Sequence, residues 1–230
     1  MAHDSPLYPV ALVVDGRRCL VVGGGPIAAH KAEGLLRCRA QVTVVAPQLT
    51  DKLRLLAGGS LVLEERRYRA GEAAHYRLVI TATGDPEVDR AVAADAEAAG
   101  VWVNSADDVD NCTFTLPAVH RDGDVTVAVS TGGASPALAG WLRDRSAAAI
   151  GPEAGTLAVL LDEARRRVRA EGRSTESTDW LAILAGPFVD LVQSGRIDEA
   201  RSLLRAAVDQ DGPDRSTPVS SHRLPGPGDR

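Results

Sequence analysis

Between residues 8 and 112 the chain alternates short apolar runs with stretches of helical pattern. The apolar runs are typical of strands buried on both faces of a sheet, and they read PVALVV, RCLVV, QVTVVAP, YRLVIT and VWV. A turn at Asp15-Gly16 separates the first two. GGGPIAAHKAEGLLRCRA, a polar stretch near 50–57 and DPEVDRAVAADAEAAG indicate helices, and LVLEERRY a further strand. In the third helix, Asp85 is a natural N-cap, Pro86 fits the first helical position and Gly100 ends it. Such alternation predicts an α/β fold with a Rossmann-like, doubly wound parallel sheet.

After residue 112 the pattern changes. TFTLPAVHRDGDVTVAVS alternates on both sides of Asp122-Gly123, which predicts a β-hairpin that forms an arm or a separate small sheet. Ser135 as N-cap and Pro136 at the first position begin another helix. From residue 151 onward only helices are expected, and the basic run ARRRVRA on the first of them is typical of a solvated face. The last twenty residues are rich in Pro, Gly and Ser, and we expect them to be disordered.

Composition narrows the class of protein. Aromatic residues make up only 3% of the 230 residues and the net charge is -5, with Lys and Arg scattered, so no nucleic-acid partner is expected. No apolar run approaches the ~18 residues of a membrane span, and the N-terminus lacks a signal-peptide layout. We therefore expect a cytoplasmic protein without membrane association. The three cysteines are widely spaced, which favours neither a disulfide framework nor a zinc site. Cys112 has no neighbouring histidine to activate it, so a structural thiol is favoured there.

A glycine-rich turn carries the first chemical signal. CLVVGGGPIAAHKA contains G-x-G-x-x-A at Gly23, Gly25 and Ala28, between a strand and a helix. The first glycine allows a tight turn, the second lets a pyrophosphate approach the backbone, and the alanine permits close helix–strand packing. The helix N-terminus adds free N–H groups for phosphate. A dinucleotide site is favoured over a merely tight turn. The second strand ends in Ala46 and Pro47, where an acid normally binds the ribose, so NAD and NADP stay open at this position.

An acidic cluster follows the strand VWVN. The segment VNSADDVDNCTF holds Asp107, Asp108 and Asp110 within four positions. Open α/β sheets bind ligands beyond the carboxyl ends of their strands, so an acid here faces the cofactor crevice. A calcium loop is disfavoured because the glycine at its sixth position and the distal Glu are missing, and we predict no metal site. A second small turn, STGG at 130–133, is either a plain connection or a backbone cradle for a carboxylate or the cofactor.

These motifs together resemble the precorrin-2 dehydrogenase / sirohydrochlorin ferrochelatase family, which includes the N-terminal half of bifunctional siroheme synthases. The ordered motifs GGG-x-(I/V)-A-x-x-KA, N-x-x-D, F-x-x-PA and S-T-G-G-x-S-P carry the resemblance. The matching stretches cover most of residues 8–145 and read YPVALVVDGRRCLVVGGGPIAAHKAEGLL, VTVVAP, VITATGDPEVDRAV and NSADDVDNCTFTLPAVHRDGDVTVAVSTGGASPALAGWLR. One departure is His30 before Lys31, where the family usually has arginine. Beyond about residue 150 the resemblance fades.

The resemblance implies an oxidoreductase that uses NAD to convert precorrin-2 to sirohydrochlorin, on the way to siroheme or a cobalamin-type corrinoid. It also implies a homodimer in which the hairpin exchanges across the interface, and a helical C-terminal domain. The methyltransferase domain of the longer synthases has no room in 230 residues. We accordingly predict an NAD-binding Rossmann-like domain at 1–112, a hairpin and dimerisation region with its connecting helix at 113–150, a helical domain at 151–210 and a disordered tail at 211–230.

The resemblance also assigns roles to residues. The family's catalytic aspartate lies three residues after the asparagine and seven before the phenylalanine, which selects Asp107 from Asn104 and Phe114 and leaves Asp108 and Asp110 as loop acids. The expected cofactor-binding residues are Gly23, Gly25, Pro26, Ile27, Ala46, Pro47, Thr83 and Asn104. The expected substrate-binding residues are Ser130, Thr131, Gly132, Gly133 and Lys31, with Arg143 and Arg145 as further candidates for an anionic tetrapyrrole.

Two other functions stay open at this point. Some family members also insert ferrous ion into sirohydrochlorin, and Asp107 could accept the pyrrole protons. Alternatively, the chain could be a non-catalytic dinucleotide-sensing module. The glycine-rich turn fits a sensor equally well, but the N-x-x-D spacing and the S-T-G-G-x-S-P stretch do not.

Overall fold

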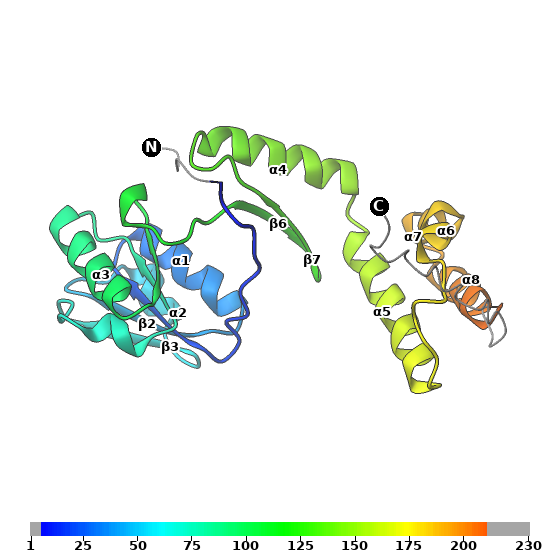
Figure 1. Ribbon diagram of the computed structural model, residues 1–230, viewed down its shortest axis with the longest axis horizontal. Coiled ribbons are helices and arrows are strands. Elements are labelled where there is room, and N and C mark those ends of the chain that lie inside the picture. Colours follow the sequence, from blue (N-terminus) through cyan, green and yellow to red (C-terminus); the bar gives the residue numbers. More distant parts are fainter. Residues whose placement is uncertain (1–5, 211–230) are drawn as a thin grey trace, which may run out of the picture. The chain divides into compact units, whose positions relative to one another are not determined.

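The computed structural model describes residues 6–210, and its first part is built on a parallel sheet. The five strands are β1 (Arg18–Val22), β2 (Gln41–Ala46), β3 (Leu61–Glu65), β4 (Leu78–Thr81) and β5 (Trp102–Ser105). All pair in parallel, in the order β3-β2-β1-β4-β5 (Figure 1). The connections hold α1 (Pro26–Arg37), α2 (Asp51–Leu56), α3 (Pro86–Ala98) and the 3-10 helix η1 (Glu72–His75). The predicted Rossmann-like doubly wound sheet is confirmed.

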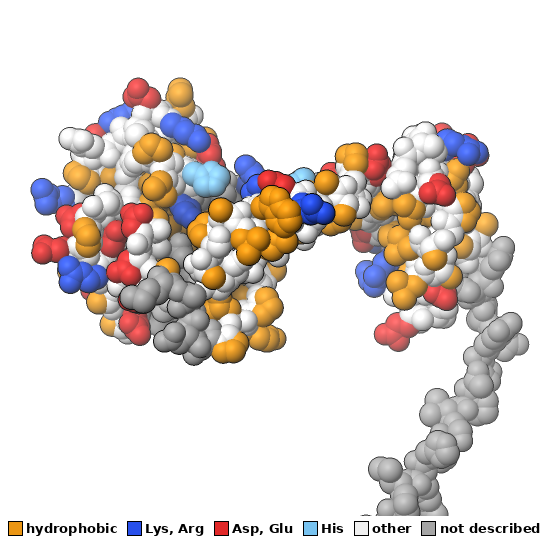
Figure 2. Space-filling model, turned by 90° about the horizontal axis from the view of Figure 1, so that it is seen from above, with side chains coloured by type: hydrophobic (Ala, Val, Ile, Leu, Met, Phe, Trp, Pro, Cys, Tyr) orange, Lys and Arg blue, Asp and Glu red, His pale blue; other side chains and the backbone are white. Residues whose placement is uncertain are grey.

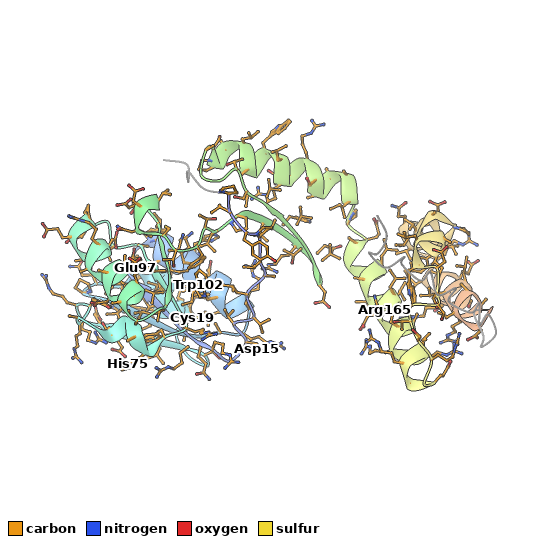
Figure 3. The ribbon with its side chains drawn as sticks, in the orientation of Figure 1. Asp15, Cys19, His75, Glu97, Trp102 and Arg165 are labelled. Carbon is orange, nitrogen blue, oxygen red and sulfur yellow. The ribbon has the colours of Figure 1, made fainter. Side chains whose placement is uncertain are left out.

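Two apolar layers cover the two faces of this sheet. Because side chains alternate along a strand, β1 contributes Cys19 and Val21 to the layer under α1, and Leu20 and Val22 to the layer under α3. Cys19 is fully buried, as expected for a cysteine that acts as a small apolar residue (Figure 3). The strand order reverses between β1 and β4, so the crevice for a ligand lies beyond the carboxyl ends of these two strands.

The strand predicted at PVALVV is wrong. Residues 6–14 belong to no strand among the described residues, and they leave Tyr8, Val10 and Val13 88%, 64% and 84% exposed. The physical reason is that β1 already has β2 on one side and β4 on the other, so the segment before it finds no free edge there. The predicted turn does form, because the N–H of Arg17 donates to the Val14 carbonyl at 2.9 Å.

The predicted hairpin and the helix after it are confirmed. The 3-10 helix η2 (Val109–Asn111) precedes the strands β6 (Ala118–Asp122) and β7 (Val125–Val129), which form a separate two-stranded sheet. α4 (Pro136–Ile150) then begins where the Leu138 N–H donates to Ser135 Oγ at 3.2 Å. Apolar side chains gather on the face of α4 shown in Figure 2, and Leu138 and Trp141 are about half exposed.

Four further helices complete the described chain: α5 (Ala154–Ala170), α6 (Trp180–Ala185), α7 (Phe188–Gln193) and α8 (Ile197–Gln210). Their shared core includes Leu160, Phe188 and Leu204. The basic run on α5 is engaged in surface contacts: Arg167 pairs with Asp209 of α8 at 3.0 Å, and Arg165 lies over the Trp180 ring (Figure 3). The predicted disordered tail at 211–230 lies outside the described residues.

The chain divides into two compact units. Among the described residues, one takes 6–120 and 128–145, and the other takes 121–127 and 146–210, so the tip of the hairpin belongs with the helical unit. No helix of the part that the structure describes is both long and apolar enough to cross a membrane.

Within the second unit, the hairpin tip caps α5. The Gly155 N–H, in the first turn of α5, donates to Asp122 Oδ2 at 2.6 Å, whereas the N-cap Glu153 makes no side-chain cap. A Cβ on Gly155 would lie 2.9 Å from the Asp122 carbonyl oxygen, so the two segments touch through backbone. We expect Asp122→Ala to lower the free energy of unfolding by about 1 kcal/mol in urea denaturation. The matched change Asp124→Ala, on the same turn, should shift it by less than about 0.5 kcal/mol; equal losses would contradict the cap.

Candidate active site

The turn between β1 and α1 rests directly on the turn after β4. Gly23 has φ +132°, and a Cβ there would lie 2.2 Å from the carbonyl oxygen of Ala82. Its own N–H donates to the Val45 carbonyl of β2 at 2.9 Å. Gly23 therefore joins the ends of three neighbouring strands, and no other residue could adopt both this conformation and this approach.

Gly24, the middle glycine of this turn, has a packing role that the motif did not predict. A Cβ on Gly24 would lie 1.8 Å from the carbonyl oxygen of Gln48 and 2.9 Å from Cβ of Ala46. The Gly24 carbonyl also accepts a hydrogen bond from the Thr50 N–H at 3.0 Å. Gly24 thus packs the glycine-rich turn against the end of β2. The small size of Ala46, which is buried, is the signal in the sequence that permits this approach.

Gly25 differs from its two neighbours because nothing in the described chain requires a glycine there. Its φ is -82°, and a Cβ would meet no atom within 4 Å. The space beside it is therefore open to a ligand. Gly25 is also the N-cap of α1 without a side-chain cap, so the N–H groups of Ile27 and Ala28 remain available, while Pro26 has none to offer. This combination fits a dinucleotide pyrophosphate.

The remaining predicted cofactor residues lie at the same edge of the sheet. Ala46 ends β2 buried, and Pro47 follows it exposed. Thr83 lies in the turn after β4, where its hydroxyl donates to Asp89 Oδ1 at 2.7 Å and accepts from the Asp85 N–H at 3.0 Å. Asp89 is a buried carboxylate that sequence reasoning missed. Thr83 therefore shapes the turn on which Gly23 rests.

Asn104, near the end of β5, is engaged within the protein. Its Nδ2 donates to the Phe114 carbonyl at 3.0 Å and approaches the sulfur of Cys112 at 3.5 Å. The Val103 N–H donates to Thr113 Oγ1 and the Thr113 N–H donates to the Val103 carbonyl, each at 2.8 Å. The Thr113 hydroxyl also donates to that carbonyl at 3.3 Å. These contacts hold the segment after the acidic cluster alongside β5. We call residues 105–112 the Asp107 loop.

The structure separates the three acids of this loop. Asp108 caps η2: its Oδ1 accepts from the Asp110 N–H at 3.0 Å and its Oδ2 from Asn111 Nδ2 at 3.2 Å. Asp107 and Asp110 are exposed, and within the described residues neither carboxylate has a partner. Asp108 therefore holds the loop, while Asp107, two residues beyond the end of β5, is free to meet a ligand. An Asp side chain in a turn often accepts a hydrogen bond from the backbone N–H two residues later, and this local tendency could have identified Asp108 as a capping residue.

Lys31 of α1 reaches the same region. It is half-buried, and burial lowers the pKa of its ammonium group, an effect that the nearby Cys112 opposes. Burial likewise raises the pKa of the Cys112 thiol, while Lys31 favours the thiolate. The helix that begins at the glycine-rich turn therefore places a cation against the Asp107 loop.

The predicted substrate turn at 130–133 forms a closed local structure. Ser130 Oγ accepts from the Gly132 N–H at 3.2 Å, and Thr131 Oγ1 accepts from the Ser135 N–H at 3.0 Å. Gly132 and Gly133 both have positive φ. No hydrogen bond within the described residues joins this turn to the Asp107 loop. On α4, Arg143 pairs with Asp144 and Arg145 lies over the Trp141 ring at 4.9 Å.

A parallel sheet with a reversal point, and a glycine-rich turn that leaves room for a pyrophosphate, define a Rossmann-type NAD(P)-binding protein. A family model described as putative NAD(P)-binding matches residues 10–118, and a second, described as sirohaem biosynthesis protein central, matches 122–145. The chain thus carries a match to an NAD(P)-binding domain, followed directly by a match to the central segment of sirohaem biosynthesis proteins. These matches confirm the predicted resemblance to sirohaem biosynthesis proteins and the predicted dinucleotide cofactor.

Curated relatives are similar over the same part of the chain. The siroheme synthase of Nitrosomonas europaea is 40% identical over 205 residues, which cover 87% of this chain and 43% of that protein. The siroheme synthase of Chromobacterium violaceum is 37% identical over 215 residues, or 92% of this chain and 46% of that protein. The chain thus spans less than half the length of these relatives.

A solved structure has the same fold. It is titled SirC, precorrin-2 dehydrogenase, and it matches with a TM-score of 0.66 at 24% sequence identity. The match covers 89% of this chain and 98% of that one. The parallel sheet, the hairpin and the helical region of the present chain therefore recur together in another protein.

Proposed function

We propose that the chain is an NAD-dependent dehydrogenase that oxidises precorrin-2 to sirohydrochlorin, with Asp107 as the proton acceptor. The observation that carries the proposal is the exposed, unengaged carboxylate of Asp107 beyond the end of β5, at the edge of the sheet that also holds the glycine-rich turn. The relatives named siroheme synthase and the neighbour named precorrin-2 dehydrogenase support the same chemistry.

Oxidation of precorrin-2 removes a hydride and a proton, and two groups must receive them. NAD, when bound, supplies the hydride acceptor. Open space at Gly25 and the free N–H groups of Ile27 and Ala28 would hold its pyrophosphate. As a C–H bond of the substrate breaks with loss of a proton, the Asp107 carboxylate accepts that proton and, being exposed, passes it to water. Lys31 would attract the substrate's carboxylates.

The proposal includes a homodimer. Its support is the apolar surface of the first unit, where Tyr8, Val13 and Trp141 are 88%, 84% and 54% exposed. Large exposed apolar surfaces often mark protein–protein interfaces. Size-exclusion chromatography with light scattering would show a mass of two chains.

The function is tested by adding precorrin-2 and NAD to the purified full chain and following NADH absorbance. We expect one NADH for each sirohydrochlorin formed. A dinucleotide sensor would give no signal, which would overturn the proposal. Incubation of sirohydrochlorin with ferrous ion, without NAD, separately tests metal insertion, since a rate equal to the spontaneous one removes that activity.

A further inference from the structure

The thiol of Cys112 joins the two ends of the segment that carries Asp107. We call these contacts of Cys112 with Ser105 and Asp108 the neck of the Asp107 loop. The Ser105 N–H donates to Cys112 Sγ at 3.2 Å, and the thiol lies 3.4 Å from the Ser105 carbonyl oxygen and 3.3 Å from that of Asp108. Those two carbonyls flank Asp107 in the chain, one on each side. A single sulfur atom therefore contacts both ends of the short segment that presents the carboxylate.

The same sulfur ties the loop to the rigid part of the fold. Asn104 Nδ2, from β5, approaches it at 3.5 Å while also donating to the Phe114 carbonyl. Lys31 of α1 acts on it electrostatically. Phe114 packs against the core layer under α1. Contacts with β5 and with α1, the helix that begins at the cofactor turn, thus fix the position of the loop.

Asp107 depends on this neck for its position. Its own carboxylate has no partner within the described residues, so only the loop backbone determines where the oxygens lie. Cys112 is half-buried, and burial raises the pKa of its thiol. The neutral thiol both accepts and donates, which a purely apolar side chain of similar size cannot do. Packing alone does not explain a cysteine with contacts to Ser105, Asn104 and Asp108 together.

We propose that Cys112 is a positioning residue for the proton-accepting carboxylate of Asp107, acting through the neck of the loop. The inference rests on the proposed function of Asp107 and adds to it the group that fixes its geometry. Cys112 contacts neither substrate nor cofactor in this role. A misplacement of about 1 Å in a reacting group lowers rates by on the order of 10²-fold.

The test is a double-mutant cycle in the full chain. Cys112→Ala should lower kcat roughly 10- to 100-fold, with KM for NAD unchanged, and Cys112→Ser should recover part of the loss because the hydroxyl keeps both hydrogen-bonding roles. In the Asp107→Asn background, Cys112→Ala should change kcat less than about 2-fold, because the carboxylate it positions is already gone. Equal losses in both backgrounds would mean a general structural role and would overturn the inference.

Amide hydrogen exchange gives a second readout that needs no turnover. Cys112→Ala should speed exchange of the Ser105 amide, while Cys38→Ala, at the far end of α1, should leave it unchanged. An unchanged exchange rate of the Ser105 amide in Cys112→Ala would show that Cys112 does not hold the loop, and would overturn the inference. If the wild-type chain gave no NADH, the proposed dehydrogenase function would fail, and the exchange result would still decide whether Cys112 holds the loop.

Discussion

Asp107→Asn is expected to lower kcat for precorrin-2 oxidation by on the order of 10²- to 10⁴-fold, the usual contribution of a positioned general base. The amide has the shape of the carboxylate but cannot accept the proton. NAD affinity should be unchanged, since the glycine-rich turn lies on another connection of the sheet. The free energy of unfolding should also hold within about 0.5 kcal/mol, because the carboxylate has no partner within the described residues. Steady-state NADH formation, calorimetric NAD titration and urea denaturation check the three expectations.

The loop supplies its own controls. Asp110→Asn removes another exposed carboxylate three residues away and should change kcat less than about 2-fold. Asp108→Ala removes the cap of η2 and should lower both stability and kcat, because the loop loses two hydrogen bonds of 3.0 and 3.2 Å. A kcat for Asp107→Asn within a factor of two of wild type would rule out Asp107 as the proton acceptor. A large loss of kcat in Asp110→Asn would assign that role to Asp110 instead.

The order of strands and helices was predictable because a parallel sheet buries both of its faces. Runs such as QVTVVAP and YRLVIT are apolar at most positions. The helix α3 has a clear N-cap, because Asp85 accepts from the Glu87 N–H at 3.0 Å. The run PVALVV carries the same local signal and yet forms no strand. Strand formation needs a free neighbouring edge, which depends on the whole sheet and not on the run itself.

The site was predictable only where a local motif encodes it. The spacing of Gly23 and Gly25 predicts the cofactor turn, because the first glycine has a positive φ and the second leaves open space beside the backbone. The hydrogen bond from Ser105 to Cys112 spans seven positions of an irregular loop, and no periodicity predicts it. Likewise the contact of Gly24 with Gln48 joins two connections that only the folded sheet brings together. Sequence spacing therefore predicts the carboxylate, whereas the contacts around its loop required the structure.

The glycines of the cofactor turn should separate folding from binding. Gly23→Ala adds a Cβ 2.2 Å from the Ala82 carbonyl oxygen at a φ of +132°, and we expect it to lower the free energy of unfolding by roughly 3–5 kcal/mol. Gly25→Ala adds a Cβ that meets no atom within 4 Å, so stability should change by less than about 0.5 kcal/mol. Its Cβ would instead occupy the approach of the pyrophosphate.

Gly25→Ala should accordingly weaken NAD binding about 10- to 100-fold, the equivalent of one hydrogen bond to a charged group, about 1.5–3 kcal/mol. Gly34→Ala, in the last turn of α1 with open space around it, is the matched control: it should leave NAD affinity unchanged and raise stability by up to about 1 kcal/mol. Calorimetric titration with NAD and urea denaturation measure both quantities. Normal NAD affinity in Gly25→Ala would show that the pyrophosphate does not lie at this turn, because no contact within the described chain otherwise explains why a glycine occupies the position.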